Sequence, residues 1–179
     1  MTAAWTRGQR RLHWLVAGAI VLALVLAALM IATPDSARLA KFLLYQAHKN
    51  VGLVVFALAT WRLALRLVHG RPAWEAGMET WQRRAAGAMH ASLHGLGLAV
   101  PVLGYLTNAT SPAHIPVLVL LAFPLPDVVG PNEALNGIFK VAHFGGAMAL
   151  LVLAVGHAAV AVVHHRRGST ILAAMLGRK

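Results

Sequence analysis

Residues 141–165 read VAHFGGAMALLVLAVGHAAVAVVHH and contain the pattern that decides the fold. The apolar stretch around them, from about Gly137 to Val163, exceeds the roughly 20 residues that a helix needs to cross a bilayer. His143 and His157 are fourteen residues apart, so at about 100° per residue their side chains diverge by only roughly 40°. At about 1.5 Å per residue they are about 21 Å apart along the axis. One helix therefore directs an imidazole toward the same interior near each membrane surface.

The composition indicates that lipid is the main solvent of the chain. Hydrophobic residues make up 59% of the 179 residues and charged residues 12%, which is about half the share in soluble domains. Three further apolar stretches of bilayer length lie at about residues 12–32, 42–67 and 85–107. Together with the stretch at about 137–163, they predict an all-α fold: an integral membrane four-helix bundle formed by a single domain over residues 1–179.

Two shorter apolar segments fall outside the predicted spans. The run from Ile115 to Phe123 lies among prolines and is too short to cross a bilayer as a helix. We expect this run to lie in the membrane interface or to pack as a loop over the bundle. The segment from Ile171 to Leu176 follows a basic tail and is expected to form an interfacial amphipathic turn.

The formal net charge of +11 indicates membrane topology rather than nucleic-acid binding, because the basic residues cluster at the ends of the apolar stretches. Twelve of the sixteen Lys and Arg residues lie on one side of the predicted bundle, and four lie on the other. The positive-inside rule then places both termini in the cytoplasm. The twelve are Arg7, Arg10, Arg11, Arg62, Arg66, Arg71, Arg83, Arg84, Arg166, Arg167, Arg178 and Lys179; the four are Arg38, Lys41, Lys49 and Lys140.

Ten histidines are the unusual feature of this chain, which has no cysteine. The lack of cysteine excludes disulfides, iron–sulfur clusters, thiolate ligation and covalent c-type haem attachment. His13 and His157 are predicted near the cytoplasmic side, and His48 and His143 near the outer side. Each depth thus offers one imidazole on each of two helices, which can hold a haem iron from opposite sides. A single membrane histidine can also simply bond to a neighbouring helix.

His90 and His94 lie four residues apart and share one face of the third span. This spacing is compatible with metal or haem ligands, with a polar contact between helices and with a quinone site, and the sequence leaves these alternatives open. The remaining four histidines are predicted in loops or at the interfaces; they are His69, His114, His164 and His165.

An ordered set of fragments over nearly the whole chain resembles the bacterial cytochrome b561 family of small di-haem b membrane proteins. The fragments are Thr6–Gln9 with Leu12-His13-Trp14, His48–Gly52, Arg62–Leu67, His90 with Pro101–Gly104, and His143 with His157 and His164-His165. The chain departs from the family pattern at His94, where a Tyr is common. It departs again at Arg166, because an Asp commonly follows the twin histidines.

The resemblance implies two haem b groups in the bundle core, one ligated by His13 and His157 and the other by His48 and His143. Two axial imidazoles fill the coordination sphere of each iron, so electron transfer is expected rather than oxygen chemistry at the iron. Basic residues near the haems are candidates for propionate contacts, although topology and lipid phosphate also explain them. They are Arg7, Arg10, Arg11, Arg62 and Arg66 on the cytoplasmic side, and Lys49 and Lys140 on the outer side.

The family includes oxidoreductases that oxidise superoxide and reduce ubiquinone, which predicts superoxide as donor at the outer side and a membrane quinone as acceptor. Lys49 and Lys140 are expected to attract the superoxide anion. A second hypothesis is a cytochrome b subunit that passes electrons between quinone and a partner dehydrogenase or a periplasmic redox protein. A third is a non-catalytic haem-binding or transport bundle.

Overall fold

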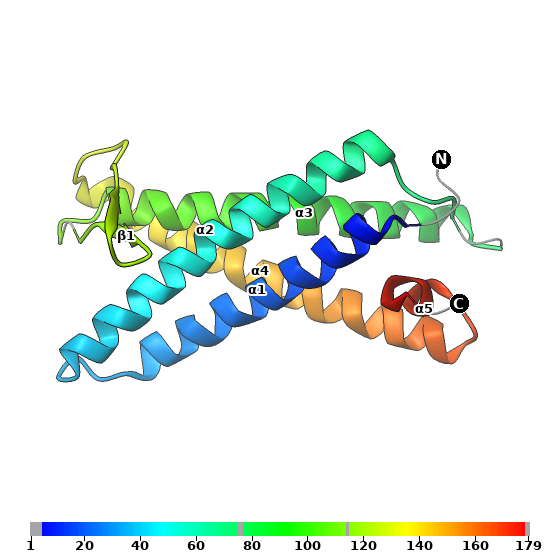
Figure 1. Ribbon diagram of the computed structural model, residues 1–179, viewed down its shortest axis with the longest axis horizontal. Coiled ribbons are helices and arrows are strands. Elements are labelled where there is room, and N and C mark those ends of the chain that lie inside the picture. The colour runs from blue at the N-terminus through cyan, green and yellow to red at the C-terminus, as the bar shows by residue number, and fades with distance from the viewer. Residues whose placement is uncertain (1–4, 75–76, 114, 178–179) are drawn as a thin grey trace.

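The computed structural model describes residues 5–74, 77–113 and 115–177, which form four long helices, a β-hairpin and a short last helix (Figure 1). The predicted fold class is confirmed, because these four helices are long and apolar enough to cross a membrane. Three residues used in the sequence analysis, His114, Arg178 and Lys179, lie outside the described residues. The helices are α1 (Arg7–Ala32), α2 (Arg38–His69), α3 (Thr80–Ala109), α4 (Glu133–Arg166) and α5 (Ile171–Leu176), and the strands are β1 (Val117–Val119) and β2 (Phe123–Leu125).

The four long helices run antiparallel. The start of α1, the helix α5 and the end of α2 lie at one end of the molecule, which we call the terminal end (Figure 1). The turn from α1 to α2 and the β-hairpin lie at the opposite end, which we call the hairpin end. Close backbone packing joins α1 to α2, α3 to α4, and α2 to α3. The bundle is thus two helical hairpins placed side by side.

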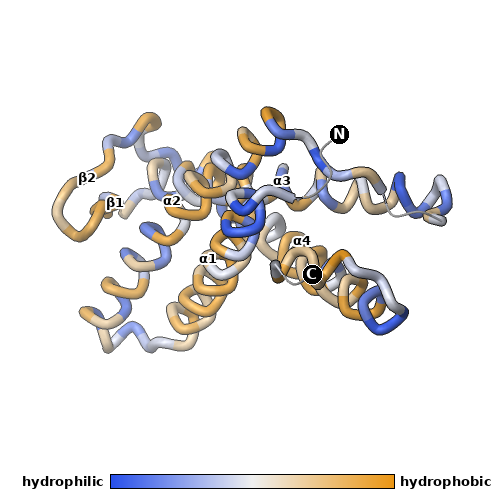
Figure 2. Tube along the Cα trace, turned by 45° about the vertical axis from the view of Figure 1, so that its right-hand side comes forward, coloured by the Kyte–Doolittle hydropathy of each residue, from blue (hydrophilic) through white to orange (hydrophobic). Residues whose placement is uncertain are grey.

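The exterior of the helices is apolar along most of their length. Figure 2 shows hydrophobic residues along α1 and α4, with hydrophilic residues concentrated at the helix ends and connections. Large side chains such as Ile31, Val141 and Val152 are 69–73% exposed. A soluble protein rarely exposes apolar surface this extensive, and lipid solvates it well. The chain is therefore a membrane protein.

Polar contacts hold the start of α1 and the end of α2 in place. Thr6 caps α1 in a capping box with Gln9, because each side chain bonds the other residue's backbone N–H. The buried Gln9 amide also donates to the carbonyl of Gly70 at 2.9 Å and so ties the start of α1 to the end of α2.

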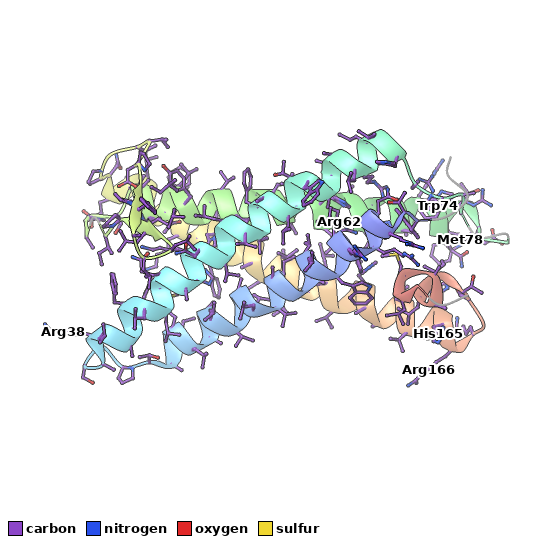
Figure 3. All side chains as sticks on the ribbon, in the orientation of Figure 1. Arg38, Arg62, Trp74, Met78, His165 and Arg166 are labelled. Atoms are coloured by element: carbon purple, nitrogen blue, oxygen red, sulfur yellow. The ribbon has the colours of Figure 1, made fainter. Side chains whose placement is uncertain are left out.

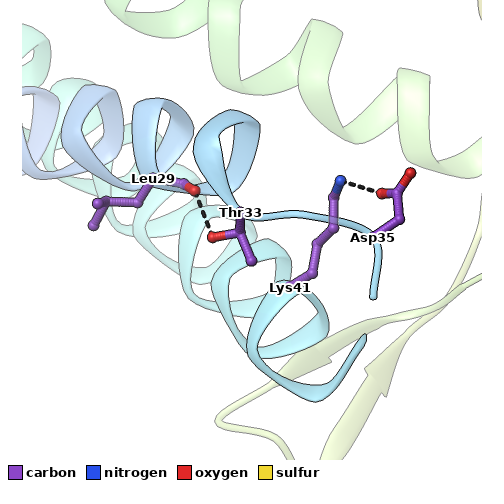
Figure 4. A network of polar contacts seen from close by, with 4 residues as sticks. All are labelled: Leu29, Thr33, Asp35 and Lys41. Carbon is purple, nitrogen blue, oxygen red and sulfur yellow. Dashed lines mark hydrogen bonds and ion pairs between the residues drawn. The ribbon is translucent and has the colours of Figure 1, made fainter. Parts of the chain in front are cut away.

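The turn between α1 and α2 is closed by two contacts (Figure 4). The Thr33 hydroxyl donates to the Leu29 carbonyl at 2.7 Å, and the Lys41 ammonium donates to the Asp35 carboxylate. The hydrogen bond from Lys41 holds the pKa of Asp35 below its ordinary value. This pair is exposed, so it contributes little to stability.

The predicted loop at residues 115–123 packs over the bundle, but it contains two antiparallel strands that the sequence analysis did not predict. Val117 pairs with Leu125 and Val119 with Phe123. Leu120 and Leu121 form the turn with positive φ, which is unusual for leucine and gives no sequence signal for a hairpin.

Two amide side chains of α2 hold this hairpin in place. Gln46 is fully buried; it donates to the Pro116 carbonyl and accepts from the Leu118 N–H, both at 2.9 Å. Asn50, one turn later, makes an equivalent pair of bonds with the carbonyl of Leu118 and the N–H of Leu120. The two amides therefore pair with the hairpin much as a neighbouring strand would.

The last segment is a helix, α5, which returns to the start of α1. The Arg10 guanidinium donates to the Ala174 carbonyl and the Trp14 indole N–H to the Met175 carbonyl, both at 3.1 Å. The Ala174 carbonyl also accepts from the Gly177 N–H that caps α5, so the two side chains add a tertiary contact at the end of this helix.

Candidate functional site

Four histidines meet in two pairs, one toward each end of the bundle. The ring centroids of His13 on α1 and His157 on α4 are 6.2 Å apart, and those of His48 on α2 and His143 on α4 are also 6.2 Å apart. We call them the terminal pair and the hairpin pair after the nearer end of the molecule. The depth matching expected from the sequence therefore brings together the same four residues.

The separation within each pair suits two imidazoles bound to one metal ion. A first-row metal bonds an imidazole nitrogen at about 2.0–2.1 Å, and the centroid lies about 1.1 Å further back, so opposed rings have centroids about 6.3 Å apart. Both pairs match this value at 6.2 Å. His90 lies closer to His157, at 5.4 Å, which is too short for two rings on opposite sides of one ion. The four residues thus fit two bis-imidazole sites, and His90 is a neighbour of one of them.

Backbone carbonyls orient both rings of the hairpin pair. His48 Nδ1 lies 3.0 Å from the Ala23 carbonyl oxygen, and His143 Nδ1 lies 2.9 Å from that of Val100. A carbonyl only accepts, so in each ring Nδ1 carries the proton and Nε2 keeps its lone pair. This is the tautomer in which Nε2 binds a metal, and such second contacts commonly orient metal-bound histidines.

The terminal pair has a charged neighbour instead of a carbonyl. The Arg62 guanidinium of α2 lies 3.0 Å from His13 Nδ1 and can only donate to it. Figure 3 shows Arg62 well inside the length of the bundle, whereas Arg38 lies at the hairpin end and Arg166 at the terminal end. A cation at this depth needs an acceptor, because an unpaired charge in a membrane interior is costly.

A cleft of about 350 Å³ opens between α2 and α3 beside the terminal pair. His94 Nδ1 donates to the His90 carbonyl at 2.7 Å, which leaves Nε2 as an acceptor. That Nε2 is buried and has no hydrogen-bond partner among the described residues. The cleft is lined by Leu63, Arg66, Gly87, His90, Ala91, His94, Gly95 and Leu98.

Arg66 lines this cleft and, apart from Arg62, the cations proposed from the sequence form no hydrogen bond with the described histidine rings. Arg7 is exposed and lines a different cleft, between α1 and α5, together with Arg10 and Arg11. Lys49 donates to the Ile115 carbonyl at 3.3 Å and so binds the segment that leads into the hairpin. Lys140 is exposed on α4, three residues before His143.

Gly104 is a close neighbour of the hairpin pair that was not predicted from the sequence. Gly104 was noted only as part of the Pro101–Gly104 fragment, but a Cβ at Gly104 would lie 2.8 Å from the His143 ring. Sequence spacing gives no signal for such a contact, because Gly104 and His143 lie on different helices.

The fold and the paired histidines define a class of protein: a membrane four-helix protein with two internal pairs of imidazole side chains. Residues 4–178 match the family model of prokaryotic cytochrome b561, and the chain belongs to this family. It is 30% identical over 139 residues to cytochrome b561 homolog 1 of Escherichia coli (strain K12), covering 76% of this chain and 77% of that protein. It is 27% identical over 118 residues to cytochrome b561 homolog 2 of the same strain, covering 66% of this chain and 62% of that protein.

Membership of the family confirms the resemblance seen in the sequence and establishes the general function. The chain is a membrane electron-transfer protein of a family that binds b-type haem. The paired rings of this structure fit that cofactor, because each pair offers two imidazoles at the separation that one iron requires.

Proposed function

We propose that the protein binds two haem b groups, one between His13 and His157 and the other between His48 and His143. The observation that supports this most directly is the common centroid separation of 6.2 Å in both ring pairs. Haem b supplies one-electron exchange between ferric and ferrous iron. Two imidazoles per iron leave no open coordination position, so electrons enter and leave without substrate binding to the metal.

We assign the hairpin end to the periplasmic side of a bacterial inner membrane and the terminal end, with both chain ends, to the cytoplasm. The surplus of Lys and Arg at the terminal end supports this orientation through the positive-inside rule. Arg62 is the best-placed residue to hold a haem propionate, because its guanidinium already lies beside the terminal pair. Arg7 and Lys49 remain candidates for the same role.

The electron donor in this proposal is superoxide, which reacts at the hairpin end. Lys140 is exposed on α4 one turn before His143 and attracts the anion toward that pair. Asp35 and Glu133 also lie at this end, so the attraction is local to Lys140. Each superoxide gives one electron and leaves as O₂.

The electron acceptor in this proposal is ubiquinone, bound in the cleft between α2 and α3. Its headgroup carbonyl accepts a hydrogen bond from Arg66, and a hydroxyl formed on reduction donates to His94 Nε2. His90 separates this cleft from His157, so the headgroup lies close to the terminal pair. Two superoxide ions, one ubiquinone and two protons give two O₂ and one ubiquinol.

The direct test mixes purified, haem-loaded protein with a superoxide source and a soluble ubiquinone analogue. We expect superoxide to reduce the haems, and ubiquinol to form at one equivalent per two superoxide ions. Superoxide dismutase in the same mixture should abolish both signals. Haems that stay oxidised would rule out superoxide as donor, and a co-purifying dehydrogenase or periplasmic redox protein that does reduce them would favour the electron-transfer subunit.

The proposed quinone contact is tested separately by His94→Ala. We expect both haems to be retained and kcat for ubiquinone reduction to fall about tenfold with KM little changed, because the hydrogen bond of about 1.5 kcal/mol to the hydroxyl formed on reduction is lost. His69→Ala, at an exposed histidine of α2, is the matched control. Loss of haem from His94→Ala would show that His94 is a ligand and that the pairing is incorrect.

A further inference from the structure

Gly104 on α3 leaves the space in which the His143 ring lies. A Cβ at Gly104 would be 2.8 Å from Cε1 and 3.0 Å from Nδ1 of that ring, which is closer than non-bonded carbons approach. The other glycines of α3 differ: a Cβ at Gly87 or Gly95 would meet nothing within 4 Å, and one at Gly97 would touch only Ala59 at 3.8 Å. Among the glycines of α3, Gly104 is thus the one that lies against an imidazole ring.

The same turn of α3 supplies the hydrogen bond that orients the ring. In a regular helix the Val100 carbonyl accepts from the N–H four residues later, which is that of Gly104. Its second lone pair accepts from His143 Nδ1 at 2.9 Å. Pro101 follows immediately and, lacking an N–H, loosens the helix at this turn. The ring therefore lies across the turn of α3 from Val100, which accepts its hydrogen bond, to Gly104, which has no side chain.

Separating α3 and α4 to admit a side chain would open buried packing beside the ring. Three residues after His143, a Cβ at Gly146 would lie only 3.0 Å from a methyl of Val100. Val100 is 8% exposed and belongs to the small core of the bundle. The helices are thus already in contact beside the ring, and a methyl group at Gly104 has to displace the ring itself.

We propose that Gly104 is a positioning residue for His143, which it holds with Nε2 directed toward His48. This inference rests on the proposed function, in which His143 is an axial ligand. The lack of a side chain at Gly104 leaves room for the His143 ring. The Val100 carbonyl accepts a hydrogen bond from Nδ1 of this ring and so keeps the proton on that nitrogen.

The test compares Gly104→Ala with Gly97→Ala in the full-length, haem-loaded protein. Both changes raise helix propensity equally, and a Cβ at Gly97 makes only an ordinary contact with Ala59, so their difference isolates the clash with His143. We expect Gly104→Ala to lose the hairpin-end haem, about half of the total, or to convert it from a low-spin to a high-spin signal in EPR. The terminal-end haem should be unchanged, and Gly97→Ala should retain both haems with the parent spectrum.

A double variant separates this inference from the proposed ligation. If His143→Ala loses one haem but Gly104→Ala keeps both with an unaltered EPR signal, the positioning role is wrong and the ligation stands. If His143→Ala keeps both haems, the proposed pairing itself fails. If Gly104→Ala does not accumulate, the variant carrying both changes should accumulate with one haem, because the ring that clashes is gone. Failure of that double variant as well would show that Gly104 serves something other than His143.

Discussion

The two histidine pairs have the same ring separation, but their surroundings differ in kind. Both rings of the hairpin pair donate to backbone carbonyls, whereas His13 of the terminal pair faces the guanidinium of Arg62. A helix carbonyl is fixed in position and uncharged, while an arginine side chain can turn to another acceptor and carries a full charge. On the proposed ligation, the hairpin pair already has the tautomer that binds iron through Nε2, whereas His13 reaches this tautomer only when Arg62 turns to another acceptor.

On the proposed ligation, the charge difference also predicts a direction of electron transfer. Arg62 and Arg66 lie at the depth of the terminal pair, and a nearby positive charge favours the reduced state of an iron site. Among the described residues, the hairpin pair has no side chain of either charge in hydrogen-bond contact with its rings. We therefore expect the terminal-end haem to have the higher reduction potential and electrons to move from the hairpin end to the terminal end.

The largest effect should come from removing one ligand of either pair. His143→Ala and His13→Ala should each lose about half of the haem, because each pair binds its iron independently of the other. A pyridine haemochrome assay per mole of protein measures this. His69→Ala, which alters an exposed histidine, should lose none. Loss of both haems from a single substitution would contradict the assignment of two independent sites.

A smaller effect is expected at Arg62, where charge rather than ligation changes. Arg62→Gln should lower the midpoint potential of the terminal-end haem, because the extra electron loses a neighbouring positive charge, and should leave the hairpin-end potential unchanged. Spectroelectrochemical titration resolves the two haems. Arg38→Gln, at the hairpin end of α2, is the control. An equal shift of both potentials would contradict the assignment of Arg62 to one pair.

Substitution of Gln46 is expected to destabilise the hairpin end without affecting the rest of the bundle. Gln46→Ala removes the partners of the Pro116 carbonyl and the Leu118 N–H, and each unsatisfied peptide group costs about 1–3 kcal/mol. Hydrogen exchange should quicken in β1 and β2 and remain slow in α1. Thr60→Ala, which loses only a bond within α2, should leave exchange in the hairpin unchanged. Uniform acceleration along the chain would show that Gln46 supports the whole bundle.

The smallest effect is expected for the exposed pair of Asp35 and Lys41. The pKa of Asp35 is lowered by Lys41, so its contribution to stability is present above the ordinary pKa of a carboxyl group. This contribution is lost as the pH falls through the lowered value. Asp35→Asn should therefore remove a slight acid sensitivity of thermal unfolding and leave both haems in place. Asp35 is 92% exposed, so a large effect at neutral pH would be inconsistent with the structure.

The four helices and the two pairs could be predicted because each rests on a pattern within one helix. The apolar stretches set the number of spans, and the fourteen-residue spacing of His143 and His157 set the depth and direction of two rings. Their partners followed from antiparallel order, which assigns a depth to His13 and His48. These inferences needed only helix geometry and bilayer thickness.

The features that sequence reasoning missed depend on contacts between elements. Gln46 and Asn50 look like ordinary polar residues of α2 until the hairpin lies beside them. Leu120 and Leu121 adopt a turn that leucine rarely forms, so tertiary contacts override local preference there. Gly104 is one of several glycines in α3, and only the position of the His143 ring distinguishes it from Gly95.

Because α4 carries one ring of each pair, the distance between the pairs is set by the rise per residue of this single helix. Lengthening a connection such as residues 110–132 leaves that distance unchanged. An extra residue between His143 and His157 would instead turn the second ring by about 100° and move it about 1.5 Å along the axis. An insertion within that stretch of α4 is therefore expected to misalign one ring, whereas an insertion in a connection leaves both rings of α4 in register.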